Sequence, residues 1–295
     1  MITVMGATGH TGSGITRRLL EAGAKVRALG RSPGKLKDLR EAGAEVLAGD
    51  AADPTFLAGA FGGSEAVYTL LPPDPGLPDY RAAQDRLGEA IVKAVQRSGV
   101  GHVVALSSVG ADQPSGPGVI VGLHAQERRL RSLAGTNVLI LRPGSFFDNF
   151  HAALGLIKHE GILGDSVGPD VPLPMIAARD VAGVAAAALR ARDWSGVVVR
   201  ELLGPRDLTH AEVARIVGER IGKPDLPYVQ LPYDEMAGAL TRAGCSESYA
   251  ALYVEMTRAL NERRIRSPEG RRPENSTPTR FEDFAQELAR AYQAQ

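Results

Sequence analysis

The stretch that decides the fold is Met5-Gly6-Ala7-Thr8-Gly9-His10-Thr11-Gly12, which closes a short apolar run over residues 2–5. Its glycines follow the spacing G-x-x-G-x-x-G and stand between a predicted strand and a predicted helix over residues 14–22. Glycine there permits a tight turn, close approach of backbone to a phosphate, and close packing of helix on strand. Backbone N–H groups and the positive helix end then face an anion. The stretch predicts a dinucleotide site with contacts from Gly6, Thr8, Gly9, His10, Thr11 and Gly12; the alternative is a turn of purely structural use.

Short β-branched runs alternate with amphipathic stretches through the first half of the chain. Strands are expected over residues 2–5, 25–29, 45–48, 66–71, 102–106 and 137–141, and helices over 14–22, 33–42, 54–61, 78–97 and 118–133. Such alternation is typical of parallel βαβ units with helices on both faces of one sheet. The sequence therefore predicts an α/β protein, with a doubly wound parallel sheet of the Rossmann type over residues 1–150.

The pattern changes after about residue 149, where helices dominate. Helices are expected over 150–159, 180–190, 210–221, 235–264 and 281–292, with strand candidates at 196–203 and 228–231. We interpret residues 151–295 as a smaller, mostly helical substrate lobe, with an approximate boundary and with strands available to the sheet. Within this lobe, the arginine-rich segment over 263–280 is interpreted as a solvated loop rather than a site for a polyanion.

Composition excludes several classes of protein. Apolar residues make up 44% and charged residues 23% of the chain, values usual for a globular protein. Lys and Arg number 34, as do Asp and Glu, so no global field favours nucleic acid or an anionic membrane. The single cysteine, Cys245, fits a reducing cytosol, and no His/Cys/Asp cluster has metal-ligand spacing. Residues 1–6 lack the basic region of a secretory signal, so we expect none, and no apolar run approaches the roughly 18 residues of a membrane span. We expect a cytoplasmic monomer or homodimer with no metal, nucleic acid or membrane partner.

The end of the second predicted strand selects the cofactor. A strand that serves NAD usually ends in Asp or Glu, which accepts a hydrogen bond from the ribose 2′-hydroxyl. This strand instead ends Leu29-Gly30-Arg31-Ser32, with Lys35 one turn into the next helix. Arg31, Ser32 and Lys35 are suited to a 2′-phosphate, which predicts NADP(H). Asp50, after the third strand, is predicted to bind the adenine amino group or to cap a helix.

The chain resembles the NmrA-like family of atypical short-chain dehydrogenases/reductases. The resemblance rests on Gly6-Ala7-Thr8-Gly9-His10-Thr11-Gly12, Gly30-Arg31, Gly49-Asp50, Ser107-Ser108-Val109-Gly110, Leu141-Arg142-Pro143-Gly144, Phe146-Phe147-Asp148-Asn149 and Ala178-Arg179-Asp180-Val181. A weaker likeness to the quinone-reductase and triphenylmethane-reductase subgroup lies in residues 233–243 and 277–279. The resemblance implies a Rossmann fold and NADP(H) binding, and we also assign Leu71, Ser107, Pro143 and Phe146 to the cofactor site.

The chain lacks an acid that is common in the wider superfamily. Many members use Tyr-x-x-x-Lys, but no tyrosine lies between Tyr80 and Tyr228 and no lysine between Lys93 and Lys158. Ser107 and Ser108 remain where the family places a hydroxyl against substrate or nicotinamide. His124 lies on the helix where the Tyr-x-x-x-Lys pair would be and is the candidate acid. The alternative is that His124 has a purely structural role.

Aromatic residues gather after the sixth predicted strand, at the carboxyl edge where such sheets bind ligands. We assign Phe146, Phe147, Asn149 and Phe150 to a planar substrate, the alternative being that the rings join the two lobes. The family resemblance implies one of two functions. With the aromatic cluster, we favour an NADPH-dependent reductase of a planar or aromatic carbonyl, quinone or similar small-molecule acceptor. The alternative that the resemblance implies is a non-catalytic NADP(H)-sensing regulator that binds a protein partner.

We predict that Arg31→Ala weakens NADPH binding by about ten- to a hundredfold and leaves NADH binding nearly unchanged. A charge-assisted contact to phosphate contributes roughly 1.5–3 kcal/mol, and NADH lacks that phosphate. Titration of the protein with each cofactor measures the two affinities. Equal losses for both cofactors would exclude Arg31 as the residue that selects NADP(H).

Overall fold

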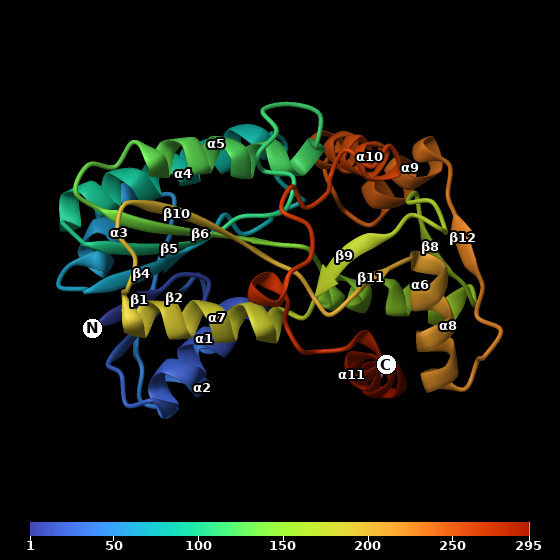
Figure 1. Ribbon diagram of the computed structural model, residues 1–295, viewed down its shortest axis with the longest axis horizontal. Helices are drawn as coiled ribbons and strands as arrows, with labels where there is room; N and C mark the ends of the chain where they lie inside the picture. Colours follow the sequence, from blue (N-terminus) through green and yellow to red (C-terminus); the bar gives the residue numbers. More distant parts are fainter. Residues whose placement is uncertain (295) are drawn as a thin grey trace.

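A seven-stranded, wholly parallel sheet forms the centre of the N-terminal region in the computed structural model, which describes residues 1–294 (Figure 1). Its strand order is β10-β6-β5-β4-β1-β2-β3. Since β1 pairs with both β2 and β4, the direction of winding reverses between β1 and β4. The strands are β1 (Ile2–Val4), β2 (Val26–Gly30), β3 (Glu45–Ala48), β4 (Ala66–Thr69), β5 (His102–Leu106), β6 (Asn137–Pro143) and β10 (Val197–Leu202). The predicted α/β class and Rossmann sheet are confirmed.

Helices cover both faces of this sheet and give two apolar cores (Figure 1). One face carries α3 (Pro54–Phe61), α4 (Tyr80–Ser98) and α5 (Val121–Arg131), and the other α1 (His10–Glu21), α2 (Lys37–Glu41) and α7 (Ala178–Ala191). The central strands are buried on both sides: Val103 packs in one core and Val104 in the other, each with 0% exposure. Continuous apolar runs in these strands are explained by this double burial.

The remaining elements form a second region at one end of the sheet (Figure 1). It contains β7 (Ser145–Phe146), β9 (Leu173–Ile176) and β11 (Asp207–Leu208) in one small sheet, β8 (Leu163–Asp165) and β12 (Tyr228–Gln230) in another, and helices α6 (Leu154–His159), α8 (His210–Ile221), α9 (Tyr233–Arg242), α10 (Glu247–Asn261) and α11 (Phe281–Ala294). The short 3-10 helices η3 (Phe147–Ala153) and η4 (Pro273–Asn275) follow β7 and α10 in the chain, whereas η1 (Gly34–Leu36) and η2 (Gly118–Ile120) precede α2 and α5 in the N-terminal region. A separate core, which includes Phe147, Phe281 and Phe284, holds this region together.

The chain returns to the parallel sheet after entering the second region. The predicted strand over 196–203 is β10, which pairs with β6 from Val197 opposite Val138 to Leu202 opposite Pro143. Helix α7 packs against α1 on the same face. Helix α7 and strand β10 therefore belong to the N-terminal region, although they follow residue 150.

One predicted helix, over residues 235–264, is wrong, because the chain breaks there into α9 and α10. Gly244 adopts a φ of +93°, which ends the continuous helix, and Ser246 then caps α10 by accepting a hydrogen bond from the Tyr249 N–H. The helical periodicity is preserved on both sides of the break, so it did not reveal the turn. This break folds α9 and α10 into a hairpin.

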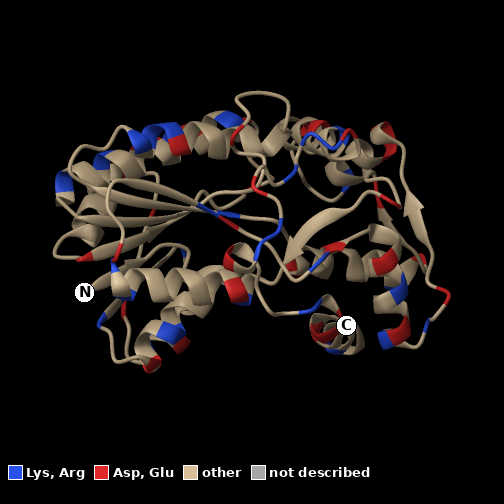
Figure 2. Ribbon diagram, in the orientation of Figure 1, with Lys and Arg blue, Asp and Glu red and all other residues tan. Residues whose placement is uncertain are grey.

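Charged residues of both signs are mixed over the helices of both regions, while the central sheet is largely free of them (Figure 2). Among residues 1–294 no helix is both long and apolar enough to cross a lipid bilayer. The same residues contain no group of three or more His, Cys, Asp or Glu side chains arranged to hold a metal ion.

Candidate active site

The glycine turn brings the N-terminus of α1 against the end of β1. Gly6 has a φ of +60°, and its carbonyl accepts a hydrogen bond of 2.9 Å from the Gly9 N–H. A Cβ on Gly12 would lie 2.2 Å from the Gly6 carbonyl oxygen, so no side chain fits there. Helix α1 has no side-chain cap and no acidic residue in its first turn, which leaves its first N–H groups for a ligand. This geometry fits the pyrophosphate of a dinucleotide.

The polar residues of the turn have different surroundings. Thr8 and His10 are exposed, and His10 Nδ1 lies 3.3 Å from an Asp148 carboxylate oxygen. Thr11 is buried, and its hydroxyl oxygen accepts a 3.1 Å hydrogen bond from Tyr68. Thr8 and His10 are thus open to a ligand, whereas the Thr11 hydroxyl is used to fix α1 on β4.

We predict that Gly12→Ala and Gly9→Ala separate the folding of the turn from its binding. Alanine at position 12 collides with backbone, so Gly12→Ala is expected to lower the melting temperature strongly or to prevent folding. A Cβ on Gly9 lies 3.4 Å from the Gly6 carbonyl oxygen, so Gly9→Ala is expected to melt near the parent temperature. It should nevertheless lose most NADPH affinity, because the methyl group occupies the approach to the phosphates. Thermal melts measure the stability of both variants, and titrations with NADPH measure their affinity. If Gly9→Ala bound NADPH as tightly as the parent protein, the assignment of this turn to the cofactor phosphates would be contradicted.

The residues that directly follow β2 in the chain include cationic side chains and no acid. The Arg31 side chain is 76% exposed and donates a 2.9 Å hydrogen bond to Asp74, from the loop between β4 and α4. Ser32 and Lys35 lie beside it, with Lys35 exposed. Asp50 accepts a hydrogen bond from the Ala52 N–H and so stabilises its own turn. Arg31, Ser32 and Lys35 are thus placed at one strand end, whereas Asp50 has a local structural contact.

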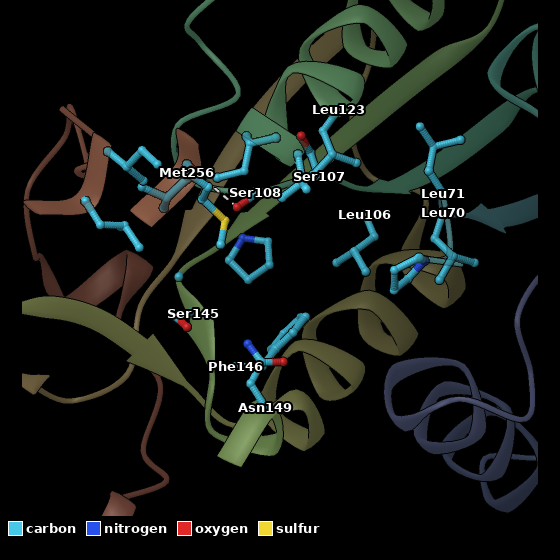
Figure 3. A pocket seen from close by; sticks show the side chains of 18 of the residues that line it. Leu70, Leu71, Leu106, Ser107, Ser108, Leu123, Ser145, Phe146, Asn149 and Met256 are labelled. Atoms are coloured by element: carbon cyan, nitrogen blue, oxygen red, sulfur yellow. Dashed lines mark hydrogen bonds between the residues drawn. The ribbon is translucent and has the colours of Figure 1, made fainter. Parts of the chain in front are cut away.

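A cavity of about 270 Å³ opens at the carboxyl edge of β4, β5 and β6 (Figure 3). Figure 3 shows Leu70 and Leu71 on one side, Met256 on the other, and Phe146 across from Leu106 and Ser107. The lining is mostly apolar, and its polar members are Tyr80, Gln84, Ser107, Ser108, Ser145 and Asn149. The cavity suits a flat, largely apolar molecule.

Six of the residues assigned from sequence meet in this cavity: Leu71, Ser107, Ser108, Pro143, Phe146 and Asn149. Phe147 and Phe150 do not line it. Phe147 is 1% exposed and packs edge-on against Phe281, and Phe150 packs against Phe281 and His210. These two rings lie inside the core of the second region, so their contacts are neither with the cavity nor with the other core clusters.

His124 also lies outside the cavity lining. Its Nδ1 is 2.8 Å from the Ala111 carbonyl oxygen, and since a carbonyl only accepts, Nδ1 carries the proton. The neighbouring Leu123 lines the cavity instead. The geometry gives His124 a contact that holds α5 to the loop after β5.

A buried ion pair fixes the hydroxyl of Ser107. Ser107 Oγ donates a 2.6 Å hydrogen bond to Glu127, whose side chain is 5% exposed. Arg142 donates to both oxygens of the same carboxylate, at 2.8 and 2.7 Å. Burial acts to lower the pKa of Arg142, but the hydrogen bonds and charge of Glu127 outweigh it and raise that pKa. With its proton held by Glu127, Ser107 offers lone pairs to the cavity and acts there as an acceptor.

We predict that Arg142→Met destabilises the protein by about 3–5 kcal/mol, because it removes both Arg142 hydrogen bonds from the buried Glu127 carboxylate and leaves only Ser107 and the half-exposed Arg131, 3.6 Å away, to balance its charge. The double variant Glu127→Gln/Arg142→Met removes both charges and is expected to recover a large part of that loss. Urea unfolding measures all three free energies. A double variant no more stable than Arg142→Met would show that the buried charge is not the source of the destabilisation.

The C-terminal segments complete the cavity, and sequence patterns did not identify them. Met256 and Leu260 of α10 line it, as does Ile265 in the arginine-rich segment. That segment is a loop, as predicted, but it is not simply solvated: Ile265 is 7% exposed, and Arg271 contacts the Gly204 carbonyl and Asp207. Tyr80 and Gln84 on α4 were also missed. Their signal was an i, i+4 pair of polar residues on a face of α4 that is otherwise buried.

A parallel sheet with a phosphate-binding turn and an apolar cavity at its carboxyl edge defines a dinucleotide-binding protein of the Rossmann class. The sequence profile of the NmrA-like family matches residues 1–282, so the chain belongs to that family. An NAD(P)H azoreductase from Xenophilus azovorans is 32% identical over 258 residues, which cover 87% of this chain and 86% of that protein. A (4-alkanoyl-5-oxo-2,5-dihydrofuran-3-yl)methyl phosphate reductase from Streptomyces griseus is 31% identical over 81% of this chain and 80% of its own length. With these relatives, the chain is an oxidoreductase of this family.

Solved structures agree with the fold. The NADPH complex of an NADPH-dependent quinone oxidoreductase from Escherichia coli superposes with a TM-score of 0.81 at 21% identity, covering 98% of this chain and 99% of that one. Citrobacter sp. triphenylmethane reductase complexed with NADP(H) gives a TM-score of 0.79 at 21% identity, covering 98% and 100%. At these identities the likeness shows the shared fold.

Proposed function

We propose that this chain is an NADPH-dependent reductase of planar, conjugated acceptors such as quinones, aromatic azo compounds or aromatic carbonyls. The observation that carries the proposal is the mostly apolar cavity of about 270 Å³, which lies at the same sheet edge as the phosphate-binding turn. NADPH, when bound, supplies a hydride to the acceptor. The chain itself supplies an enclosure that excludes water and orients the acceptor.

The cofactor assignment follows the residues at the sheet edge. The turn Gly6, Thr8, Gly9, His10, Thr11 and Gly12 would hold the pyrophosphate, Arg31, Ser32 and Lys35 the 2′-phosphate, Asp50 the adenine, and Leu71, Ser107, Pro143 and Phe146 the nicotinamide half. NADPH is preferred to NADH because β2 ends in Gly30-Arg31-Ser32 without an acid of its own, and because Arg31, although paired with Asp74, keeps an exposed side chain. In this arrangement Ser107 accepts a hydrogen bond from a donor such as a carboxamide N–H.

The names of the relatives support flat, conjugated substrates. They describe reductases of azo compounds, quinones, triphenylmethane dyes and an unsaturated lactone. Phe146 lines the cavity and offers an aromatic face to such a ring, while Asn149 lies at the same wall with its side chain exposed. Hydride addition leaves a delocalised anion on a quinone, an azo compound or an unsaturated lactone and a neutral product on a cationic dye, so reduction does not require the tyrosine and lysine that α5 lacks. A cytoplasmic location and a monomeric or homodimeric state complete the proposal.

We expect the purified protein to oxidise NADPH steadily in the presence of menadione or methyl red. The rate with NADPH should be much higher than the rate with NADH. Cyclohexanone, which is neither flat nor conjugated, serves as the control acceptor and should give little turnover. Nicotinamide absorbance follows the reaction. Tight NADPH binding without turnover of any acceptor would contradict the reductase and favour the cofactor-sensing regulator.

A further inference from the structure

Four hydroxyl groups line the cavity, but they do not offer the same chemistry. Ser107 donates its proton to Glu127, and Ser108 donates to the Val109 carbonyl oxygen at 2.9 Å. Ser145 is exposed at the rim. Tyr80 is enclosed, with 3% exposure, and within residues 1–294 its hydroxyl makes no hydrogen bond as a donor. Tyr80 is therefore the enclosed hydroxyl whose proton remains available to a ligand.

Gln84 orients the Tyr80 hydroxyl. Its Nε2 donates to the Tyr80 oxygen at 3.1 Å, one helical turn along α4. Its Oε1 lies against α5, at a point only 1.8 Å from where a Cβ on Gly122 would be. An amide N–H turned towards the Gly122 Cα would find no acceptor there, which supports this orientation of the amide. The Tyr80 oxygen thus already accepts one hydrogen bond, and its own O–H is left to donate.

Tyr80 and Gln84 lie beside the helix that carries the catalytic tyrosine in the wider superfamily. Gly122 lies on the helix where the wider superfamily carries its Tyr-x-x-x-Lys pair, and Gln84 fills the space that a side chain at 122 would need. Tyr80 comes from α4, the helix that packs against α5. A phenol therefore reaches the same wall of the cavity from the neighbouring helix.

The second region fixes the Tyr80 ring. It makes an edge-to-face contact with Tyr249 of α10, with 5.0 Å between ring centroids, and the Tyr80 N–H donates to Ser248 Oγ at 3.3 Å. Burial raises the pKa of Tyr80, and the nearby Tyr249 and Asp74 raise it further. The hydroxyl is consequently neutral at physiological pH and stays a donor.

We propose that Tyr80 donates a hydrogen bond to the acceptor atom on which negative charge develops during reduction. This rests on the proposed reductase function. Hydride addition leaves the electron pair on a quinone oxygen or an azo nitrogen, and a proton from water completes the reduction. A preorganised donor aimed at such a charge acts most strongly in an enclosed site.

Tyr80→Phe tests this role because it keeps the ring and its contact with Tyr249 but removes the hydroxyl. We expect kcat with methyl red to fall roughly a hundredfold, with the Kd for NADPH unchanged. With menadione, whose reduced form spreads its charge, the fall should be smaller. Tyr249→Phe, in the same aromatic cluster but outside the cavity lining, is the matched control and should keep parental kcat. Parental turnover of both acceptors by Tyr80→Phe would overturn the proposal.

A binding measurement decides the role of Tyr80 without turnover. The NADP⁺-saturated protein is titrated with 4-nitrophenolate, which mimics the charged oxygen, and with neutral nitrobenzene. We expect Tyr80→Phe to weaken phenolate binding about tenfold or more and to leave nitrobenzene binding unchanged. Equal losses for both ligands, or no loss for the phenolate, would overturn the donor role. If the parent protein reduced none of the acceptors, the proposed function would fail while this titration still decided on Tyr80.

Discussion

The contact between Gly12 and the Gly6 carbonyl is the constraint on which the rest of the structure depends. With only 2.2 Å available to a Cβ, helix α1 can start where it does only if position 12 lacks a side chain. The resulting close approach places α1 on the sheet, and Gly14 then lets α7 pack against it, since a Cβ there would lie 2.9 Å from that of Ala182. Helix α7 leads into β10, so a glycine contact at the N-terminus supports the last strand of the sheet.

A second constraint is that the buried polar groups beside the cavity must satisfy one another's hydrogen bonds. The buried Glu127 and Arg142 satisfy each other through two hydrogen bonds, and Glu127 also takes the proton of Ser107. An ion pair buried this deeply is tolerated only when its remaining hydrogen-bonding positions are filled. The consequence for chemistry is that Ser107 accepts and Tyr80 donates, so the two hydroxyls are suited to different atoms of the bound molecules.

The second region contributes to the site mainly by enclosure. Helix α10 brings Met256 and Leu260 to the cavity and Tyr249 to the ring of Tyr80, and the following loop brings Ile265. These residues come from a segment more than a hundred positions after the strands that they cover. Without this covering segment the sheet edge would be exposed to solvent, so the exclusion of water from the cavity depends on it.

The sequence by itself determined the features that a short stretch of backbone requires. The glycine turn, the alternation of strands and helices, the absent acid after β2 and the missing tyrosine of α5 are all local, because each follows from the backbone conformation or chemistry of a few neighbouring residues. Tertiary structure decided which side chains meet. The pairing of β10 with β6, the burial of Phe147 and Phe150, the contact of His124 with Ala111 and the position of Tyr80 in the cavity depend on packing between distant segments. Helical and strand periodicity shows that a residue faces a neighbour but not which neighbour it faces, so these contacts were fixed only when the whole chain folded.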